Sequence, residues 1–317
     1  MTSYTFKTYL ADGREYFVYG EKELTKKDFP FPESLLELLY LDVWSLEPLT
    51  KQMDRTLQEL YQTREDRCAQ EIQRLLDELA GKHIYFEFLR LDWMERLEQS
   101  RQNRYGDAVD VLPHKEIAWI PSNLDAMQKQ ILRLFAKALD IDGEKKSVQE
   151  KMVEYYTQAG DDTLNTFQFR PQPVNFEVID SRTFTEVLYP NSIYDLIDFA
   201  VRECVKREVK LRVCKNCGRY FYFTGRISAE YCNRTVDDKG RTCKEIGAFR
   251  AWEKKRSGDD LFKLYRREYK KRFAWIKAGK ISQEDFYAWS EQAREKKDAC
   301  EAGICTRDEF EAWISSV

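Results

Sequence analysis

Histidine is scarce in this sequence, which has only two, His83 and His114, among 317 residues. His83 precedes the aromatic segment Ile84-Tyr85-Phe86, and His114 follows Pro113. Neither has a second metal ligand or a nucleophile at a recognisable spacing, and an isolated histidine is usually a surface or core residue. We therefore expect neither histidine to be catalytic.

The motifs of common enzyme classes are absent as well. The sequence contains no Walker phosphate-binding loop, no glycine-rich dinucleotide turn, no serine elbow and no zinc-protease helix motif. We therefore expect the protein not to be an enzyme. A site built from distant carboxylates in the N-terminal region stays open as an alternative.

Long apolar runs are also missing. No segment reaches the length needed to span a membrane, and the N-terminus does not resemble a signal peptide. Hydrophobic residues make up 43% and charged residues 34%, which is typical of a soluble, helix-rich protein long enough for two domains. Together with a metal-type cysteine set, these absences predict a cytoplasmic protein.

Eight cysteines are present, and four are spaced as metal ligands: Cys214, Cys217, Cys232 and Cys243. A tetrahedral zinc ion takes four thiolates at about 2.3 Å each. A thioredoxin-type redox pair would need a surrounding βαβ pattern, which is absent, and a disulfide pair would suit a secreted protein. Ordinary unligated cysteines are the third alternative. The spacing predicts a structural Zn²⁺ in a four-cysteine zinc ribbon.

The residues around these cysteines favour the same interpretation. Gly218 follows the first pair and can take the positive φ of a metal knuckle. Thr242 and Glu245 have the spacing of a helix capping box, which would place Cys243 in the first turn of a helix. The positive end of the helix dipole stabilises a thiolate there.

The other four cysteines have no convincing metal spacing. Cys68 and Cys204 lie on predicted helices, where cysteine is more often a core residue than a ligand. Cys300 and Cys305 lie around the second copy of a weak repeat in the C-terminal tail, described below.

The cysteine segment resembles the zinc-binding part of an uncharacterised family of bacterial proteins. The resemblance rests on Cys214-Lys-Asn-Cys-Gly-Arg-Tyr-Phe, Tyr231-Cys-Asn-Arg and Thr242-Cys-Lys-Glu-Ile-Gly, and it runs from about Ser192 to the C-terminus. It implies zinc ligands and no activity. The segment is more loosely similar to CGNR-type zinc fingers of bacterial transcription regulators, but it has Lys244-Glu-Ile where that family has Gly-Asn-Arg. A role in DNA binding transfers from that family only as analogy.

The positive charge is concentrated in one part of the chain. Residues 202–280 contain 24 Lys and Arg against 10 Asp and Glu, a net charge of +14, whereas the rest of the chain has a net charge of −17. Such asymmetry indicates binding to a polyanion, here DNA or RNA. The candidate phosphate contacts are Lys215, Arg219, Arg226, Arg234, Arg241, Lys244, Arg250, Lys254, Lys255 and Arg256.

Two other interpretations of this segment stay open. The cations can be the solvated face of packed helices. The zinc can also stabilise a protein-interaction or scaffold module, with the acidic N-terminal region as the docking surface. Binding that weakens with salt would favour nucleic acid.

Periodicity predicts an α+β, mainly α-helical fold. Residues 4–20 alternate around Asp12-Gly13 as a hairpin, 165–190 contain two or three strands, and helical spacing covers 32–103, 124–139, 148–156 and 191–207. The tail repeats Gly279 to Trp289 as Gly303 to Trp313, and each copy contains a capping box that begins at Ser282 or Thr306. We expect an acidic N-terminal domain at 1–190, the zinc ribbon with a basic helix at 191–257, and a helical tail at 258–317.

Overall fold

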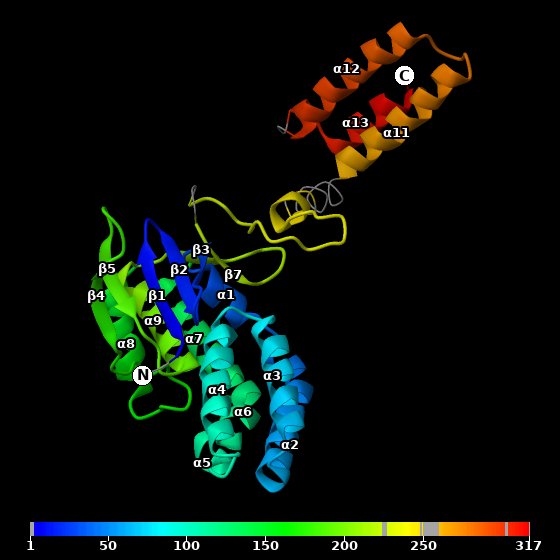
Figure 1. Ribbon diagram of the computed structural model, residues 1–317. Coiled ribbons are helices and arrows are strands. Elements are labelled where there is room, and N and C mark those ends of the chain that lie inside the picture. The colour runs from blue at the N-terminus through cyan, green and yellow to red at the C-terminus, as the bar shows by residue number, and fades with distance from the viewer. Residues whose placement is uncertain (1–2, 224–226, 248, 250–259, 302–303, 317) are drawn as a thin grey trace. The chain divides into compact units, whose positions relative to one another are not determined.

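The computed structural model describes residues 3–223, 227–247, 249, 260–301 and 304–316 (Figure 1). It shows an α+β fold made mainly of helices, with one five-stranded and one two-stranded antiparallel sheet. The fold class expected from the sequence is confirmed. The chain forms two compact units, one of Met1–Val213 with Arg219–Ser228 and one of Cys214–Gly218 with Ala229–Val317.

The larger sheet belongs to the first unit and has the strand order β3-β2-β1-β5-β4. Its strands are β1 (Thr5–Ala11), β2 (Arg14–Gly20), β3 (Thr25–Pro30), β4 (Val174–Val178) and β5 (Phe184–Leu188). Asp12 and Gly13 connect β1 to β2 with φ angles of 50° and 72°, as a two-residue hairpin turn requires. This turn confirms the predicted hairpin.

Ten helical segments are described in the first unit before β4, including two short non-α segments. They are α1 (Glu33–Leu39), η1 (Val43–Leu46), α2 (Glu47–Thr63), α3 (Asp66–Ala80), α4 (Tyr85–Gln102), α5 (Ala108–Val111), α6 (His114–Ala118), α7 (Ile120–Leu134) with its π-helical extension η2 (Phe135–Leu139), and α8 (Val148–Ala159).

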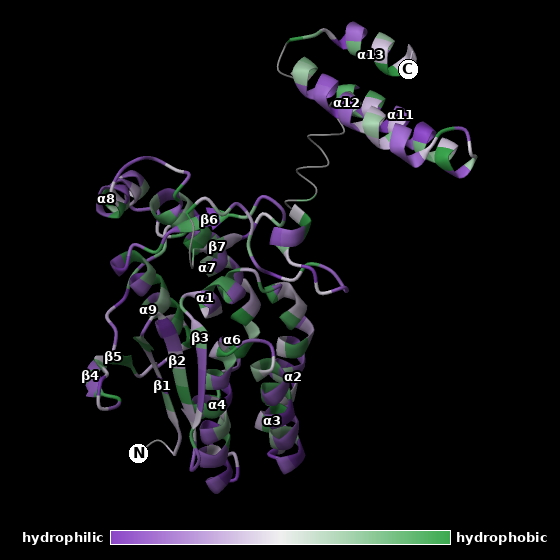
Figure 2. Ribbon diagram, turned by 90° about the horizontal axis from the view of Figure 1, so that it is seen from above, coloured by the Kyte–Doolittle hydropathy of each residue, from purple (hydrophilic) through white to green (hydrophobic). Residues whose placement is uncertain are grey.

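The core of this unit lies between the sheet and these helices. On the sheet, Phe6 meets Phe88 of α4 edge-on, with ring centroids 5.6 Å apart. Within the helical layer, Ile72, Leu75 and Leu79 of α3 are fully buried at helical spacing. Each such side chain contributes about 1.5–3 kcal/mol by leaving water. Figure 2 shows the hydrophobic residues along these helices, α2 to α4.

The outer end of the sheet is less well covered. Phe176 and Val178 of β4 and Phe184 of β5 are 63%, 74% and 66% exposed, and the two phenylalanine rings stack on each other. The strand register places these side chains on the same face as Leu188, which is buried beside β1. The apolar inner face of the sheet therefore extends beyond the helices that cover it.

The first unit continues past Pro190, where the sequence placed a domain boundary. α9 (Ile193–Lys206) is capped by Ser192, and Leu196, Ile197 and Val201 are buried in the core of the first unit. β6 (Leu211–Val213) and β7 (Tyr220–Tyr222) follow as a small hairpin. Because α9 is needed to complete this core, the second unit begins only at Cys214.

Three helices are described in the tail: α11 (Asp260–Lys277), α12 (Gln283–Glu301) and α13 (Arg307–Ser316). The backbone N–H of Asp285 donates to Ser282 Oγ, and that of Glu309 donates to Thr306 Oγ1, so both repeat copies contain the predicted cap. Phe286 and Phe310 are each 1% exposed within one apolar cluster. Cys300 and Cys305 form a disulfide between the end of α12 and the residues before α13, a pairing that the sequence reasoning did not foresee.

No helix among the described ranges is both long and apolar enough to cross a lipid bilayer.

Candidate metal centre

The four predicted ligand cysteines come together in the second unit. Their sulfur atoms all lie within 4.8 Å of one another, and those of Cys217 and Cys232 are 3.8 Å apart. In a tetrahedron with metal–sulfur bonds of about 2.3 Å, the expected sulfur–sulfur separation is about 3.8 Å. Cys214, Cys232 and Cys243 are buried, and Cys217 is partly exposed. The cluster therefore fits one metal ion with four thiolate ligands.

The first pair of ligands lies in the loop that joins β6 to β7. The N–H of Gly218 donates to the carbonyl of Cys214 at 2.9 Å, and Gly218 has a φ of 71°. A side chain at this φ would be strained, so glycine suits the turn. The turn with positive φ that the sequence predicts at Gly218 is therefore present.

The second pair lies at the base of a short hairpin. The N–H of Cys243 donates to the carbonyl of Arg234 at 2.8 Å, and that of Lys244 donates to the carbonyl of Cys232 at 3.0 Å. A β-bridge between Thr235 and Thr242 continues this pairing. The ten residues between the two cysteines thus fold back on themselves, which explains how a long spacing still gives adjacent ligands.

A helix begins at the fourth cysteine, because residues 243–247 are helical. The N–H of Glu245 donates to Thr242 Oγ1 at 3.3 Å, while Glu245 Oε2 accepts the N–H of Thr242 at 2.7 Å. Both halves of the predicted capping box are therefore present. Cys243 lies in the first helical turn, where the dipole favours a negatively charged sulfur.

Hydrogen bonds to sulfur support thiolates at this centre. The N–H of Cys232 donates to Cys214 Sγ at 3.4 Å. Burial raises the pKa of Cys214, but N–H donors, led by that of Cys217, outweigh it and lower the pKa to about 7. Burial raises the pKa of both Cys232 and Cys243. A bound divalent cation would keep all four sulfurs deprotonated.

Two further contacts at this centre were not revealed by the sequence. The side-chain N–H of Asn216, inside the first pair, donates to Cys243 Sγ at 3.4 Å. Gly247 lies directly against the ring of Tyr231, so that a Cβ on Gly247 would be only 2.3 Å from a ring atom. Both contacts join residues distant in sequence, and no local pattern signals them.

The predicted phosphate contacts have different environments. Lys215 pairs with Glu230, and Arg241 pairs with Asp237, each at 2.6 Å. The guanidinium of Arg219 lies over the ring of Tyr40, 5.2 Å from its centroid. The others fall into three groups: Arg234 is partly buried, Lys244 is exposed, and Arg226, Arg250, Lys254, Lys255 and Arg256 lie outside the described residues.

The two histidines and the two helical cysteines all lie in the first unit, and three of the four are buried. His83 is 7% exposed, with Nε2 2.9 Å from the carbonyl oxygen of Ser34. Nδ1 of His114 lies 3.0 Å from Oδ1 of Asp54. Cys68 and Cys204 are buried in the core.

A buried polar cluster in the first unit has unusual titration behaviour. The N–H and Oγ–H of Ser34 donate to the two carboxylate oxygens of Glu15, each at 2.7 Å, and Ser34 Oγ is 3.0 Å from the Tyr85 hydroxyl. Burial raises the pKa of Glu15 to about 7, despite the two bonds from Ser34. Burial also lowers the pKa of His83 to about 4.

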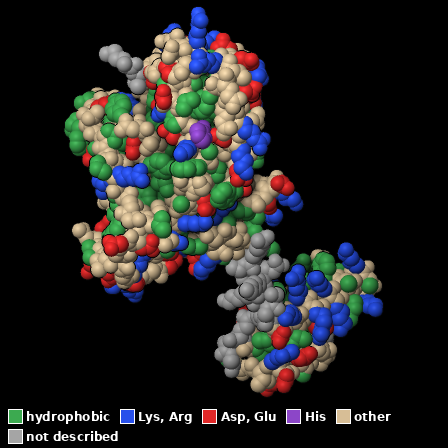
Figure 3. All heavy atoms as spheres, turned by 90° about the horizontal axis from the view of Figure 1, so that it is seen from below, with side chains coloured by type: hydrophobic (Ala, Val, Ile, Leu, Met, Phe, Trp, Pro, Cys, Tyr) green, Lys and Arg blue, Asp and Glu red, His purple; other side chains and the backbone are tan. Residues whose placement is uncertain are grey.

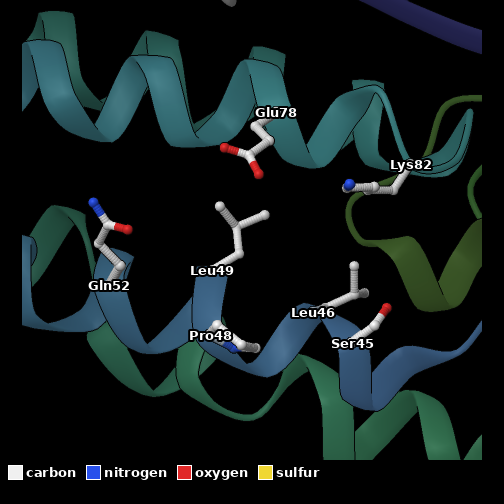
Figure 4. A pocket seen from close by; sticks show the side chains of 7 residues that line it. All are labelled: Ser45, Leu46, Pro48, Leu49, Gln52, Glu78 and Lys82. Atoms are coloured by element: carbon white, nitrogen blue, oxygen red, sulfur yellow. The ribbon is translucent and has the colours of Figure 1, made fainter.

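A shallow pocket lies between α2 and α3 (Figure 4). It is lined by Ser45, Leu46, Pro48, Leu49, Gln52, Glu78 and Lys82. The lining contains one carboxylate and one ammonium group and no histidine or cysteine, so it offers no constellation for acid–base or metal chemistry.

The comparison with known proteins finds a match to one family, whose function is unknown. Residues 169–315 match a family of unknown function (DUF6076). No curated protein and no solved structure matches the chain. The resemblance of the C-terminal part to an uncharacterised family is confirmed, and the match starts before β4 rather than at Ser192. Neither the zinc ribbon nor the likeness to CGNR-type fingers follows from this match.

Proposed function

We propose that the segment from Cys214 onward is a module that binds Zn²⁺ for stability and binds nucleic acid, in particular DNA. The observation that carries this proposal is the cluster of four cysteine sulfurs within 4.8 Å, formed inside the most basic part of the chain. Four thiolates complete the zinc shell and leave no open position for a substrate. The metal therefore has a structural role.

Nucleic acid is the partner that this charge distribution favours. Residues 202–280 have a net charge of +14, and four thiolates on a divalent ion reduce it to about +12. Lys244 is exposed beside the fourth ligand, and the described residues provide no carboxylate partner for it. A rigid metal centre would hold such cations in place for phosphate groups.

A protein-interaction or scaffold module is the second candidate. The ion pairs of Lys215 and Arg241 favour it, because each neutralises a cation that would otherwise contact phosphate. In that case the metal would stabilise a surface for a protein partner, and the basic segment would be its solvated exterior.

Metal analysis and DNA titration of the full chain test the proposal. We expect one zinc per chain and binding to a labelled duplex in fluorescence polarisation. If about four phosphates are contacted, the affinity should fall on the order of 100-fold between about 50 mM and 200 mM salt. Zinc without binding at the lower salt would overturn the nucleic-acid role and leave the interaction module. Protein without bound metal would overturn the zinc assignment.

Two lysines beside the cysteines make a matched pair of variants. Lys244→Gln should weaken binding about three- to tenfold and lower the salt slope by about 1. Lys215→Gln changes the net charge equally but removes a lysine already paired with Glu230, so its effect should be smaller. Equal effects would show that only the overall charge matters, against a phosphate contact at Lys244.

A further inference from the structure

The exposed face of α11 carries a row of cations that contains one aromatic ring. Arg266, Lys270, Phe273 and Lys277 follow one another at intervals of four, three and four residues, which places them on one side of a helix. All four are exposed, and Phe273 is 47% exposed. Figure 3 shows Lys and Arg side chains gathered over the C-terminal helices.

The three cations of this row are available for a ligand. Within residues 260–301 and 304–316 and the other described ranges, no carboxylate pairs with Arg266, Lys270 or Lys277. Their neighbours differ, since Lys263 pairs with Asp260 and Lys271 with Glu268. The positive potential of α11 is therefore concentrated along the row that includes Phe273.

The ring of Phe273 is held in a defined orientation by the tail core. The plane of this ring is tilted by 5° from that of Tyr269, and the two ring centroids are 6.5 Å apart. The ring also meets that of Phe286 in α12 edge-on, with centroids 5.7 Å apart. A ring that is already ordered loses little conformational entropy when a ligand stacks on it. Almost half of its surface remains open to solvent.

Phe176 is another exposed phenylalanine, but its neighbours differ from those of Phe273. Phe176 is more exposed, at 63%, but it follows Asn175, precedes Glu177 and pairs across the sheet with Glu186. Glu186 is itself paired with Lys206, and Glu177 with Lys7, so these two lysines are already neutralised. At Phe273, by contrast, an open ring lies in a row of cations for which the described residues provide no carboxylate partner.

We propose that this row binds single-stranded nucleic acid, with Arg266, Lys270 and Lys277 contacting phosphates and a base stacking on Phe273. A strand with unpaired bases presents both a negative backbone and free aromatic faces, whereas the bases of a duplex already stack on each other. This inference rests on the proposed function and specifies the class of nucleic acid.

The test compares two probes with the full-length, metal-loaded protein. Fluorescence polarisation would measure its affinity for a labelled single strand of about 20 nucleotides and for the matching duplex. We expect the single strand to bind more tightly, on the order of tenfold. Phe273→Leu keeps an apolar side chain but removes the π face, and it should weaken single-strand binding about five- to tenfold with less than a twofold effect on the duplex.

Matched variants separate the row from general effects. Phe176→Leu makes the same change in the first unit and should leave both affinities unchanged. Lys270→Gln should weaken binding more than Lys271→Gln, because Lys271 is already paired with Glu268. Circular dichroism would show that each variant keeps its helices.

The outcomes distinguish this inference from the proposed function. Binding of the duplex and the single strand with equal affinity, or an unchanged affinity in Phe273→Leu, would overturn the row and leave the nucleic-acid role intact. Failure to bind either probe at low salt would overturn both.

Discussion

The side-chain amide of Asn216 donates a hydrogen bond to the sulfur of Cys243, 27 residues further along the chain. Asn216 lies between Cys214 and Cys217, so this bond connects the first knuckle to the ligand in the helix. A donor to a thiolate lowers its basicity and fixes its direction, as outer-shell partners of metal ligands do.

Removing that donor should weaken metal binding. We expect Asn216→Ala to lower the affinity for Zn²⁺ by about tenfold or more, measured by competition with a chromophoric chelator. Asn233→Ala is the matched control, because Asn233 also adjoins a ligand cysteine but is exposed. Equal affinities of the two variants would contradict a role for the Asn216 contact.

The contact between Gly247 and Tyr231 predicts a steric effect. In Gly247→Ala the new methyl group would be 2.3 Å from the Tyr231 ring and 3.1 Å from Cβ of Asn216, so the ring must move. We expect a loss of about 1–3 kcal/mol in stability, seen as a lower thermal midpoint of the metal-loaded protein. Adding Tyr231→Ala to the Gly247→Ala variant should recover part of the lost stability. Gly81→Ala is the control, since its nearest neighbour would be 3.4 Å away.

The raised pKa of Glu15 predicts that the free energy of unfolding depends on pH. Its pKa is about 7 in the folded protein and 4.5 in an ordinary environment, so the folded protein holds the proton more tightly. The contribution of Glu15 to the free energy of unfolding therefore falls as pH rises from 4.5 to 7, by about 3 kcal/mol. Glu15→Gln should abolish this loss and be more stable than the unchanged protein at pH 8.

Chemical denaturation at several pH values would measure this effect. His83, whose pKa is lowered, changes stability in the opposite direction, because its contribution is lost as pH falls from 6.5 towards 4. The difference between Glu15→Gln and the unchanged protein cancels the His83 contribution. A difference that stays constant between pH 5 and 8 would contradict the raised pKa.

The disulfide between Cys300 and Cys305 predicts a separate response to reductant. It closes a short loop, so the chain-entropy model gives it a stabilising effect of about 2 kcal/mol on the tail. Reductant should lower the unfolding midpoint of the tail and leave the metal content unchanged. A protein carrying both Cys300→Ser and Cys305→Ser should unfold at the lower midpoint with or without reductant. Two reactive thiols at these positions in the unreduced, unfolded protein would contradict the pairing.

Local sequence signals were sufficient where a feature depends on neighbouring residues. Asp12-Gly13 predicted the hairpin because positive φ angles at both positions are a property of the dipeptide. Thr242 and Glu245 predicted the helix start because a capping box spans only four residues. The cysteine spacing likewise predicted which four sulfurs would come together.

Features that depend on tertiary packing were missed. β3 contains Lys26, Lys27 and Asp28, and its mostly exposed residues do not alternate between apolar and polar, so it carries no strand pattern. The place of α9 in the core of the first unit depends on the helices and sheet that surround it. That unit therefore extends past Pro190, where the sequence placed a boundary, to Val213. The phosphate contacts, the zinc identity and the absence of catalysis stay predictions.

The loop Cys214–Gly218 belongs to the second unit, although the hairpin strands on either side of it belong to the first. The backbone therefore passes from one unit to the other three times, at 213–214, 218–219 and 228–229. A break at 213–214 keeps all four cysteines together but separates β6 from β7, whereas a break at 228–229 loses Cys214 and Cys217. A single breakpoint in evolution would thus either split the hairpin of the first unit or leave one pair of ligands behind.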